Sequence, residues 1–204
     1  LSNSTINFST IHCKCTVIII VYYLISFIGI IINTRKTTRL IYTDFVTGGN
    51  NWLHFVKKGT KLLKKKAFGR NYAVVHMKMR KYRSFCTCFG VKEGEALIEK
   101  MYRVLNKNLK HNEAMAHQEN AEFGLMLAYT DKQQLIARIE SIEKALNAIL
   151  PKMKLYFAVG VYEVQQKERD IEQLYNNAML ACDMLGEEVE NQTAFFVMGA
   201  YGRG

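Results

Sequence analysis

The stretch from His117 to Leu127 reads HQENAEFGLML, a short polar segment followed by a run of strand-forming residues. Polar and small residues between two apolar runs are typical of a β-hairpin turn, and the flanking runs 113–118 and 123–130 are the expected strands. An active-site loop whose functional residues have been replaced would look the same. The rest of the chain is needed to choose between these two interpretations.

The spacing of apolar residues predicts further helices and strands on both sides of this hairpin. Helices are expected at residues 52–68, 94–109, 131–150 and 170–185, and strands at 71–79, 154–164 and 193–198. Asp131 is the expected N-cap of the helix at 131–150, whose expected buried positions are Leu135, Ile136, Ile139, Ile142, Leu146 and Ile149. Strands that alternate with crossover helices predict an α/β or α+β domain with helices packed on a sheet.

Residues 16–33 are expected to form a transmembrane helix, because the run TVIIIVYYLISFIGIII at 16–32 contains no charged side chain. At about 1.5 Å per residue this run spans roughly 26 Å, slightly less than the roughly 30 Å hydrocarbon core of a bilayer. A cleaved signal peptide is the alternative, but no small-residue cleavage pattern follows the apolar run. We therefore expect a single-pass membrane anchor.

Positive charge is concentrated directly after this segment. The stretch from Arg35 to Arg83 has 14 Lys and Arg against one acid, a net charge of +13, whereas the rest of the chain carries −3. Lys14 alone precedes the apolar run, so the positive-inside rule places the C-terminal side in the cytoplasm.

The lysines of the helix at 52–68 have three interpretations. They form a solvated face, a contact for anionic lipid headgroups worth about 1 kcal/mol each, or a surface for nucleic acid. No aromatic stacking platform or DNA-reading motif accompanies them, so no nucleic-acid partner is expected.

The five cysteines are an odd number without disulfide-like spacing. Those in the soluble part are expected to be reduced cytosolic thiols. Cys86 and Cys88 have the spacing of half a metal site, but no second Cys or His pair lies nearby in the sequence, so no metal site is predicted there.

Several short motifs, taken in order, resemble those of the GGDEF domain family, the diguanylate cyclases that condense two GTP into cyclic di-GMP. DFVTGGNNWLHF at 44–55 is similar to the family's D-x-L-T-G-L-x-N-R-x-x-F, and FGVKEGEAL at 89–97 to y-G-x-x-x-G-D-x-L. LYFAVGVYE at 155–163 resembles the late strand that ends in S-x-G, and IEQLYNNAMLA at 171–181 the terminal helix with paired alanines. ENAEF at 119–123 then falls on the signature position.

The resemblance implies a nucleotidyl-cyclase-like fold, with a central mixed sheet flanked by helices and preceded by one transmembrane helix.

The resemblance also implies an altered active site. Glu119 and Asn120 replace the two glycines that let the backbone approach the triphosphate, and Glu119 brings negative charge towards the phosphates. Ala121 replaces a carboxylate that binds a divalent metal, and Lys78 aligns with the other metal-binding Asp. Glu122 and Phe123 remain from the signature.

Phosphoryl transfer in this family depends on positioning and on metal charge, and Mg²⁺ is held by oxygen ligands. An alanine provides no ligand and an ammonium repels the ion, so the chain is expected to have no intact catalytic residue, no metal site and no cyclase activity. Mg²⁺ and GTP are expected as ligands only if activity or binding is retained.

Other functional positions of the family are also changed. The Asn that contacts guanine aligns with Cys86, and its Asp partner with Glu95. Lys78, Cys86, Glu95 and Glu122 are therefore the nucleotide-binding candidates. The product-inhibition motif R-x-x-D falls on Lys110 to Glu113, which keeps the charge signs but loses the bidentate fork of Arg.

The domains expected from these observations are an extracytoplasmic remnant at 1–15, the transmembrane helix at 16–33, a basic linker at 34–43, a degenerate GGDEF domain at 44–199 and a tail at 200–204. In this family such degenerate domains often precede an EAL-type cyclic di-GMP phosphodiesterase domain, and we expect this sequence to end just before one.

The expected function is that of a regulatory or GTP-sensing module in cyclic di-GMP signalling, anchored in the bacterial inner membrane. Its expected partners are the lipid bilayer, GTP, a second copy in a homodimer or an attached EAL-type domain. Two alternatives stay open. One is an active diguanylate cyclase with a displaced metal site built from Glu95, Glu119 and Glu122. The other is a structural or dimerisation adaptor that binds no nucleotide.

Overall fold

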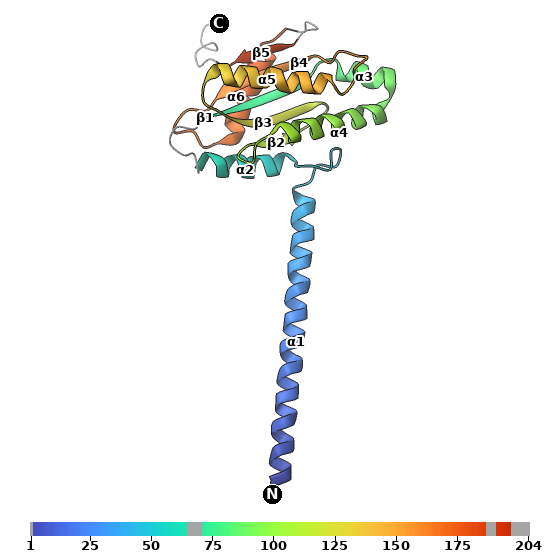
Figure 1. Cartoon of the computed structure of the whole chain (residues 1–204), viewed down its shortest axis with the longest axis vertical. Coiled ribbons are helices and arrows are strands. Elements are labelled where there is room, and N and C mark those ends of the chain that lie inside the picture. The colour runs from blue at the N-terminus through green and yellow to red at the C-terminus, as the bar shows by residue number, and fades with distance from the viewer. Residues whose placement is uncertain (1, 65–70, 187–190, 197–204) are drawn as a thin grey trace. The chain divides into compact units, whose positions relative to one another are not determined.

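The computed structural model describes residues 2–64, 71–186 and 191–196, and the chain divides into two compact units, residues 1–41 and 42–204 (Figure 1). The first unit is helix α1 (Ser2–Ile41). Within the described residues, the part of α1 from Thr16 to Ile41 is long and apolar enough to cross a membrane, a property that membrane anchors and signal sequences share.

Helix α1 is longer than the predicted span at both ends. Residues 34–41, which were predicted as a basic linker, continue the helix as far as Ile41. The sequence contains no glycine or proline between Gly29 and Gly48, so nothing in it interrupts the helical backbone.

The second unit contains five helices and five strands within the described residues. In chain order these are α2 (Trp52–Lys64), β1 (Asn71–Met79), α3 (Tyr82–Phe89), α4 (Val91–Asn108), β2 (Ala114–His117), β3 (Glu122–Tyr129), α5 (Lys132–Asn147), β4 (Phe157–Glu163), α6 (Ile171–Asp183) and β5 (Gln192–Phe195).

These strands form a mixed sheet with the order β2-β3-β1-β4-β5. Strand β1 lies in the middle and runs antiparallel to β3 and β4, whereas β4 and β5 are parallel. His76 on β1 is opposite Gly124 on one side and Gly160 on the other. The sheet and its flanking helices therefore have the mixed architecture that was predicted.

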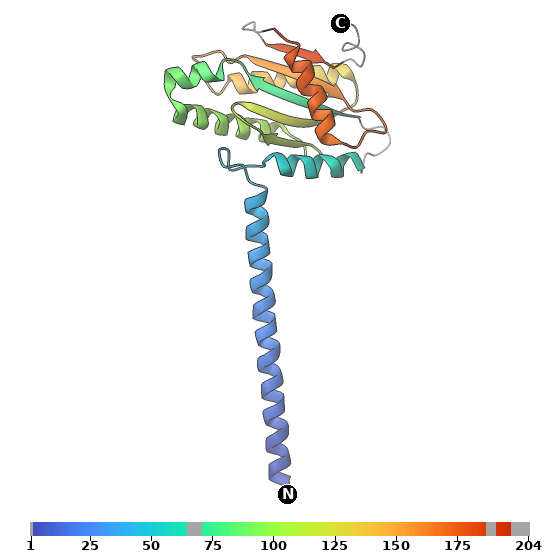
Figure 2. The same ribbon diagram turned by 180° about the vertical axis from the view of Figure 1, so that it is seen from behind.

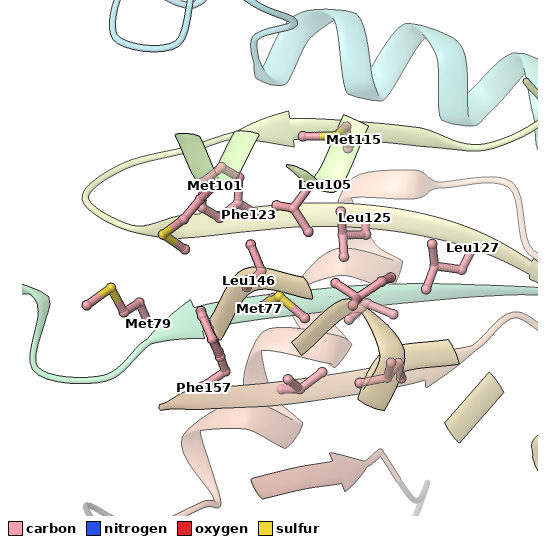
Figure 3. Packing of buried hydrophobic residues seen from close by; sticks show 14 of the residues in the cluster. Met77, Met79, Met101, Leu105, Met115, Phe123, Leu125, Leu127, Leu146 and Phe157 are labelled. Atoms are coloured by element: carbon pink, nitrogen blue, oxygen red, sulfur yellow. The ribbon is translucent and has the colours of Figure 1, made fainter. Parts of the chain in front are cut away.

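Helices cover both faces of the sheet, so side chains of β1 point alternately into two cores. Ala73, Val75 and Met77 contribute to the core under α4 and α5, whereas Tyr72 and Val74 contribute to the core under α2 and α6. Figure 3 shows Met77, Phe123 and Phe157 from three adjacent strands beside Leu146 of α5 in the first core, and Figure 2 shows α6 across the other face. The strand is buried almost throughout and is the central element of the fold.

Most predicted elements are confirmed, with differences at their ends. The side chain of Asp131 accepts a hydrogen bond from the Gln134 N–H at 2.9 Å, as expected of an N-cap. Ile136 was predicted to be buried, which is wrong, because its side chain is 37% exposed on the outer side of α5. Ile149 is only half-buried. The predicted helix end at 65–68, the strand end at 197–198 and the tail at 200–204 lie outside the described residues.

Helix α3 was not predicted. Its sequence, YRSFCTCF, carries no apolar repeat long enough to indicate a helix, and none of its residues is fully buried. Gly94 of α4 approaches it closely, because a methyl group at Gly94 would lie 2.4 Å from Cys86 Sγ. Packing against α4, rather than local propensity, therefore stabilises this helix.

The close approach of α6 to β4 depends on Gly160. A methyl group at this position would lie 1.9 Å from the carbonyl oxygen of Ala178 and 2.6 Å from the backbone nitrogen of Cys182. We predict that Gly160→Ala lowers the free energy of unfolding by about 1–3 kcal/mol, because backbone atoms must move apart. The measurement is urea unfolding of the detergent-solubilised chain, followed by the fluorescence of Trp52, the only tryptophan.

Gly186→Ala is the matched control for this variant. Nothing lies within 4 Å of a methyl group at Gly186, so its effect should stay within about 0.5 kcal/mol. Equal unfolding midpoints for Gly160→Ala and Gly186→Ala would contradict the close approach of α6 to β4 at Gly160.

Glu143 on α5 is a buried carboxyl, and its Oε1 has no hydrogen-bond partner among the described residues. Burial, assisted by the negative charge of Glu140, raises the pKa of Glu143 to about 7 from its ordinary value of 4.5. The folded state therefore keeps the proton more tightly than the unfolded state does. The stability that this proton provides is complete below pH 4.5 and is lost as the pH rises through 7.

We predict that Glu143→Gln makes the chain more stable than wild type at pH 8 and changes little at pH 4, because the amide stays neutral throughout. Urea unfolding at both pH values measures the difference. The exposed Glu172→Gln is the control and should show no such change between pH 4 and 8. A constant difference between wild type and Glu143→Gln across this range would be evidence against the proton linkage.

Candidate functional site

The β2–β3 hairpin meets the end of the central strand. Lys78 of β1 is opposite Glu122 of β3, and the Met79 N–H donates to the carbonyl oxygen of Ala121 at 3.0 Å. Residues 117–127 thus belong to a hairpin, as predicted, and its turn lies beside Lys78.

The hairpin turn is formed without glycine. Asn120 has a φ of +48°, in the left-handed region that Asn tolerates better than most residues. The Glu122 N–H donates to the carbonyl oxygen of Glu119 at 2.9 Å, and the Gln118 N–H to that of Glu122 at 3.0 Å. Asn120 therefore provides the backbone conformation that glycine would otherwise supply.

A buried histidine ties this hairpin to the loop that precedes α2. His117 is 4% exposed, and its Nε2 lies 2.8 Å from the carbonyl oxygen of Asn120 while its Nδ1 lies 3.1 Å from Asp44 Oδ1. Asp44 also accepts hydrogen bonds from the backbone and hydroxyl of Thr47. Burial alone would raise the pKa of Asp44, but the hydrogen bonds from Thr47 and His117 outweigh it and lower the pKa below its ordinary value.

Lys78 and Glu122 form an ion pair beside the hairpin turn. Lys78 Nζ lies 3.2 Å from Glu122 Oε1, with the lysine half-exposed and the glutamate mostly buried. Lys78 thus neutralises Glu122, the carboxylate that was expected to remain from the signature. Because the lysine is half in water, the pair contributes at most about 1 kcal/mol to stability.

His76 and Tyr175 lie behind this pair. His76 Nδ1 is 2.7 Å from the Tyr175 hydroxyl, and its Nε2 is 3.8 Å from Glu122 Oε2. Burial, assisted by the positive charge of Lys78, lowers the pKa of His76 to about 4, so the imidazole is neutral at pH 7. The contact between His76 and Glu122 is therefore not an ion pair under ordinary conditions.

An open cleft of about 330 Å³ lies at this end of the sheet. Its lining residues come from the end of β1, the start of α3 and the hairpin turn: Lys78, Met79, Lys81, Tyr82, Arg83, Asn120, Ala121 and Glu122. Three basic side chains against one carboxylate give the lining a net charge of +2. The cleft therefore has the electrostatics of an anion site.

No three His, Cys, Asp or Glu side chains in residues 2–64, 71–186 and 191–196 are grouped closely enough to hold a metal ion. Glu122 is the one carboxylate among the described residues that line the cleft, and Glu119 is exposed outside the lining. Ala121 is 1% exposed and packs in the core, so it offers no ligand.

The predicted base-recognition residues lie near each other. Cys86 is half-buried on α3 and Glu95 is exposed on α4, and Tyr82, which lines the cleft, interacts with both. Burial raises the pKa of the Tyr82 phenol, with smaller contributions from Cys86 and Glu95. The structure thus brings Cys86, Glu95 and the cleft together at one edge of the domain.

Among the described residues, Cys86, Cys88 and Cys182 are free thiols. Burial raises the pKa of Cys182 to about 11, so this thiol is protonated at neutral pH.

The pair predicted to resemble the inhibitory site is placed differently. Lys110 is exposed, whereas Glu113 is fully buried and forms an ion pair with Arg138 of α5. Arg138 Nη2 donates to Glu113 Oε2 at 2.6 Å, and the Ala128 N–H donates to Oε1 at 3.0 Å. Both oxygens of Glu113 are used within the domain, so this carboxylate is a structural residue rather than an exposed ligand-binding group.

Sequence reasoning missed several residues of the cleft. Lys81 and Arg83 were counted only as part of a basic stretch, and the Asp44–His117 contact joins residues far apart in the chain. The basic residues between the strand at 71–79 and the next glycine were the available signal. Without a predicted α3, they could not be placed beside the hairpin.

Comparison with protein-family models identifies this architecture. The model described as "Diguanylate cyclase, GGDEF domain" matches residues 41–192, more than half of the chain. The chain belongs to the GGDEF domain family. Its role therefore lies in cyclic di-GMP signalling, the pathway of this family. No curated protein is similar enough in sequence to match.

Solved structures share the fold of this GGDEF domain at low sequence identity. The coiled coil and GGDEF domain of DgcB from Caulobacter crescentus, in complex with c-di-GMP, has 14% identity and a TM-score of 0.71, over 82% of this chain and 92% of that one. Diguanylate cyclase SiaD from Pseudomonas aeruginosa, in complex with its activator SiaC, has 15% identity and a TM-score of 0.64, over 95% and 77%. The GGDEF domain of FimX from the same species has 14% identity and a TM-score of 0.63, over 74% and 98%. At these identities the likeness establishes the fold alone.

The buried Glu113–Arg138 pair generates a stability prediction. Arg138→Ala should lower the free energy of unfolding by about 3–5 kcal/mol, because it leaves the Glu113 charge buried without its partner. Urea unfolding followed by Trp52 fluorescence measures the loss.

Arg103→Ala is the control, since Arg103 pairs with Glu99 on the exposed side of α4 and should change stability by less than about 0.5 kcal/mol. If both variants lower the free energy of unfolding by the same small amount, the Glu113–Arg138 pair does not stabilise the core as argued here.

Proposed function

We propose that this chain is a membrane-anchored, catalytically inactive GGDEF domain that binds GTP without a metal ion and acts as a regulatory module. The observation that carries the proposal is the ion pair between Lys78 and Glu122, 3.2 Å apart at the edge of the cleft. The cation of Lys78 stands at the position where the resemblance to the family implies a metal-binding carboxylate.

The loss of cyclase activity follows from the chemistry of the cleft. Mg²⁺ is bound through carboxylate, carbonyl and water oxygens, and formation of cyclic di-GMP from GTP requires its charge to stabilise the negative charge that develops as the α-phosphate is attacked and pyrophosphate leaves. Ala121 supplies no oxygen ligand from its side chain, and Glu122 is already paired with Lys78. The ammonium of Lys78 also repels a divalent cation at the same place.

Retention of GTP binding is supported by the charge of the cleft lining. Lys78, Lys81 and Arg83 surround the hairpin turn, and a triphosphate can form charge-assisted hydrogen bonds with such side chains directly. Cys86 and Glu95 lie at the same edge and are the proposed base-contacting residues, with Glu95 as acceptor for the guanine edge.

Anchoring is supported by the apolar helix α1 and by the basic residues that follow its apolar part. We propose that α1 spans the inner membrane, with the domain in the cytoplasm. A second copy of the chain or an attached EAL-type domain is the proposed recipient of the signal.

Calorimetric titration of GTP into the detergent-solubilised chain tests this function. We expect binding in EDTA, unchanged affinity on addition of Mg²⁺, and no cyclic di-GMP after prolonged incubation. Lys78→Ala should weaken binding about tenfold or more, the effect of losing one charge-assisted hydrogen bond of about 1.5–3 kcal/mol.

Lys100→Ala, an exposed lysine on α4 away from the cleft, is the control and should bind GTP like wild type. Absence of binding in every condition would favour the adaptor alternative. Binding that requires Mg²⁺, followed by product formation, would show an active cyclase and overturn the proposal.

A variant that restores both carboxylates provides an independent test. Lys78→Asp combined with Ala121→Asp should create divalent-metal binding, because two new carboxylates then lie beside an unpaired Glu122. Titration with Mn²⁺ should show binding in the double variant and none in wild type. Equal Mn²⁺ binding by both would mean that the wild-type cleft already holds a metal.

A further inference from the structure

Helix α2 presents two opposite faces. Its inner face carries the fully buried side chains of Phe55 and Leu63, which pack in one core with residues of β2 and β3. Its outer face follows from helical spacing, since Leu53, Lys57, Lys61 and Lys64 recur every three or four residues and are all exposed. Among the described residues, the buried positions of α2, Phe55, Gly59 and Leu63, all lie on the inner face.

The outer face is basic and carries almost no compensating charge. From Tyr42 to Lys64 the sequence has four lysines and one acid, Asp44, which gives a net charge of +3. The Asp44 carboxylate is only 15% exposed and is already bonded to Thr47 and His117. The lysines of this face therefore face solvent without a neighbouring acid in their own segment.

Apolar and aromatic groups lie among these charges. Lys57 Nζ is 4.5 Å above the ring centre of Tyr42 and 3.2 Å from its hydroxyl. Leu53 is 50% exposed and Phe45, in the preceding loop, is 95% exposed. Tyrosine rings with lysines and exposed apolar side chains are typical of surfaces that contact the headgroup region of a bilayer.

Chain connectivity limits how far this segment can be from the apolar helix. Phe45 is four residues beyond Ile41, the last residue of α1, and four residues extend over at most about 14 Å. The outer face of α2 begins eight residues further on. It therefore belongs to the part of the domain that the sequence ties closest to the proposed anchor.

We propose that the outer face of α2, defined by Leu53, Lys57, Lys61 and Lys64, docks on the surface of a bilayer that contains anionic lipids. The inference rests on the membrane anchor of the proposed function for its geometry, but not on nucleotide binding. Lysine ammoniums pair with the phosphates of anionic headgroups, and the exposed leucine enters the interfacial region. Because α2 packs on the hairpin strands, docking fixes the hairpin relative to the membrane.

Energy transfer from Trp52 to a dansyl-labelled headgroup lipid tests the proposal in the full chain, reconstituted into vesicles. Trp52 is the only tryptophan and opens α2, so it reports the distance of this helix from the bilayer. The transfer efficiency should be about twofold higher with about 30% phosphatidylglycerol than with phosphatidylcholine alone. About 0.5 M salt should remove the increase, because it screens exposed charges.

Charge reversal identifies the face. The triple variant Lys57→Glu, Lys61→Glu and Lys64→Glu should lose the increase. The control triple variant Lys100→Glu, Lys107→Glu and Lys144→Glu changes exposed lysines of α4 and α5 and has the same net charge. It should keep the increase in transfer efficiency. Unchanged urea midpoints for both variants would exclude unfolding as the cause.

Three results would overturn docking. They are equal transfer in neutral and anionic vesicles, equal loss in both triple variants, and binding of a DNA duplex by the α2 lysines without any response to anionic lipid. Flotation with neutral vesicles tests the anchor separately. If the chain floats only with anionic vesicles and the α2 triple variant does not float, the docking surface stands and the anchor fails.

Discussion

Burial of strand β1 on both faces is the constraint on which the domain depends. A strand in the middle of a sheet, covered by helices on each side, must supply apolar side chains in both directions. Its residues therefore divide between the core under α4 and α5 and the core under α2 and α6. Gly124 and Gly160, opposite His76 on the two neighbouring strands, allow rings and backbone of the second layer to approach the sheet.

The end of this strand connects the fold with the cleft. Where β1 leaves the core, Lys78 is half-exposed and pairs with Glu122, while the neighbouring Met77 and Met79 stay buried. Because Lys78 lies on the buried strand β1 itself, the strand fixes the position of this charged side chain beside the hairpin turn. A GGDEF domain with metal-binding carboxylates at these positions would concentrate negative charge here, whereas this chain concentrates positive charge.

Much of the fold was predictable from the sequence, because each long element has its own pattern of apolar residues. The helix at 131–150 and its Asp131 cap followed from local rules, as did the hairpin. Helix α3 and the exposure of Ile136 did not, since both depend on which neighbouring element covers a given face. The cleft was predicted in part. Lys78, Ala121 and Glu122 were identified by resemblance, but Lys81 and Arg83 join them only through the turn at the start of α3.

The sequence by itself determined the order of the elements, the apolar helix, the basic stretch and the substitutions in the signature turn, because each of these features depends only on residues that are close together in the chain. Only the tertiary structure decided what these residues contact. Glu113 looked like a surface carboxylate of a short motif, yet Arg138 from another helix holds it in the core. Glu122 was predicted as a nucleotide-binding candidate, yet Lys78 from another strand neutralises it. Both outcomes depend on pairings between distant segments, and Coulomb interactions and burial act through space rather than along the chain.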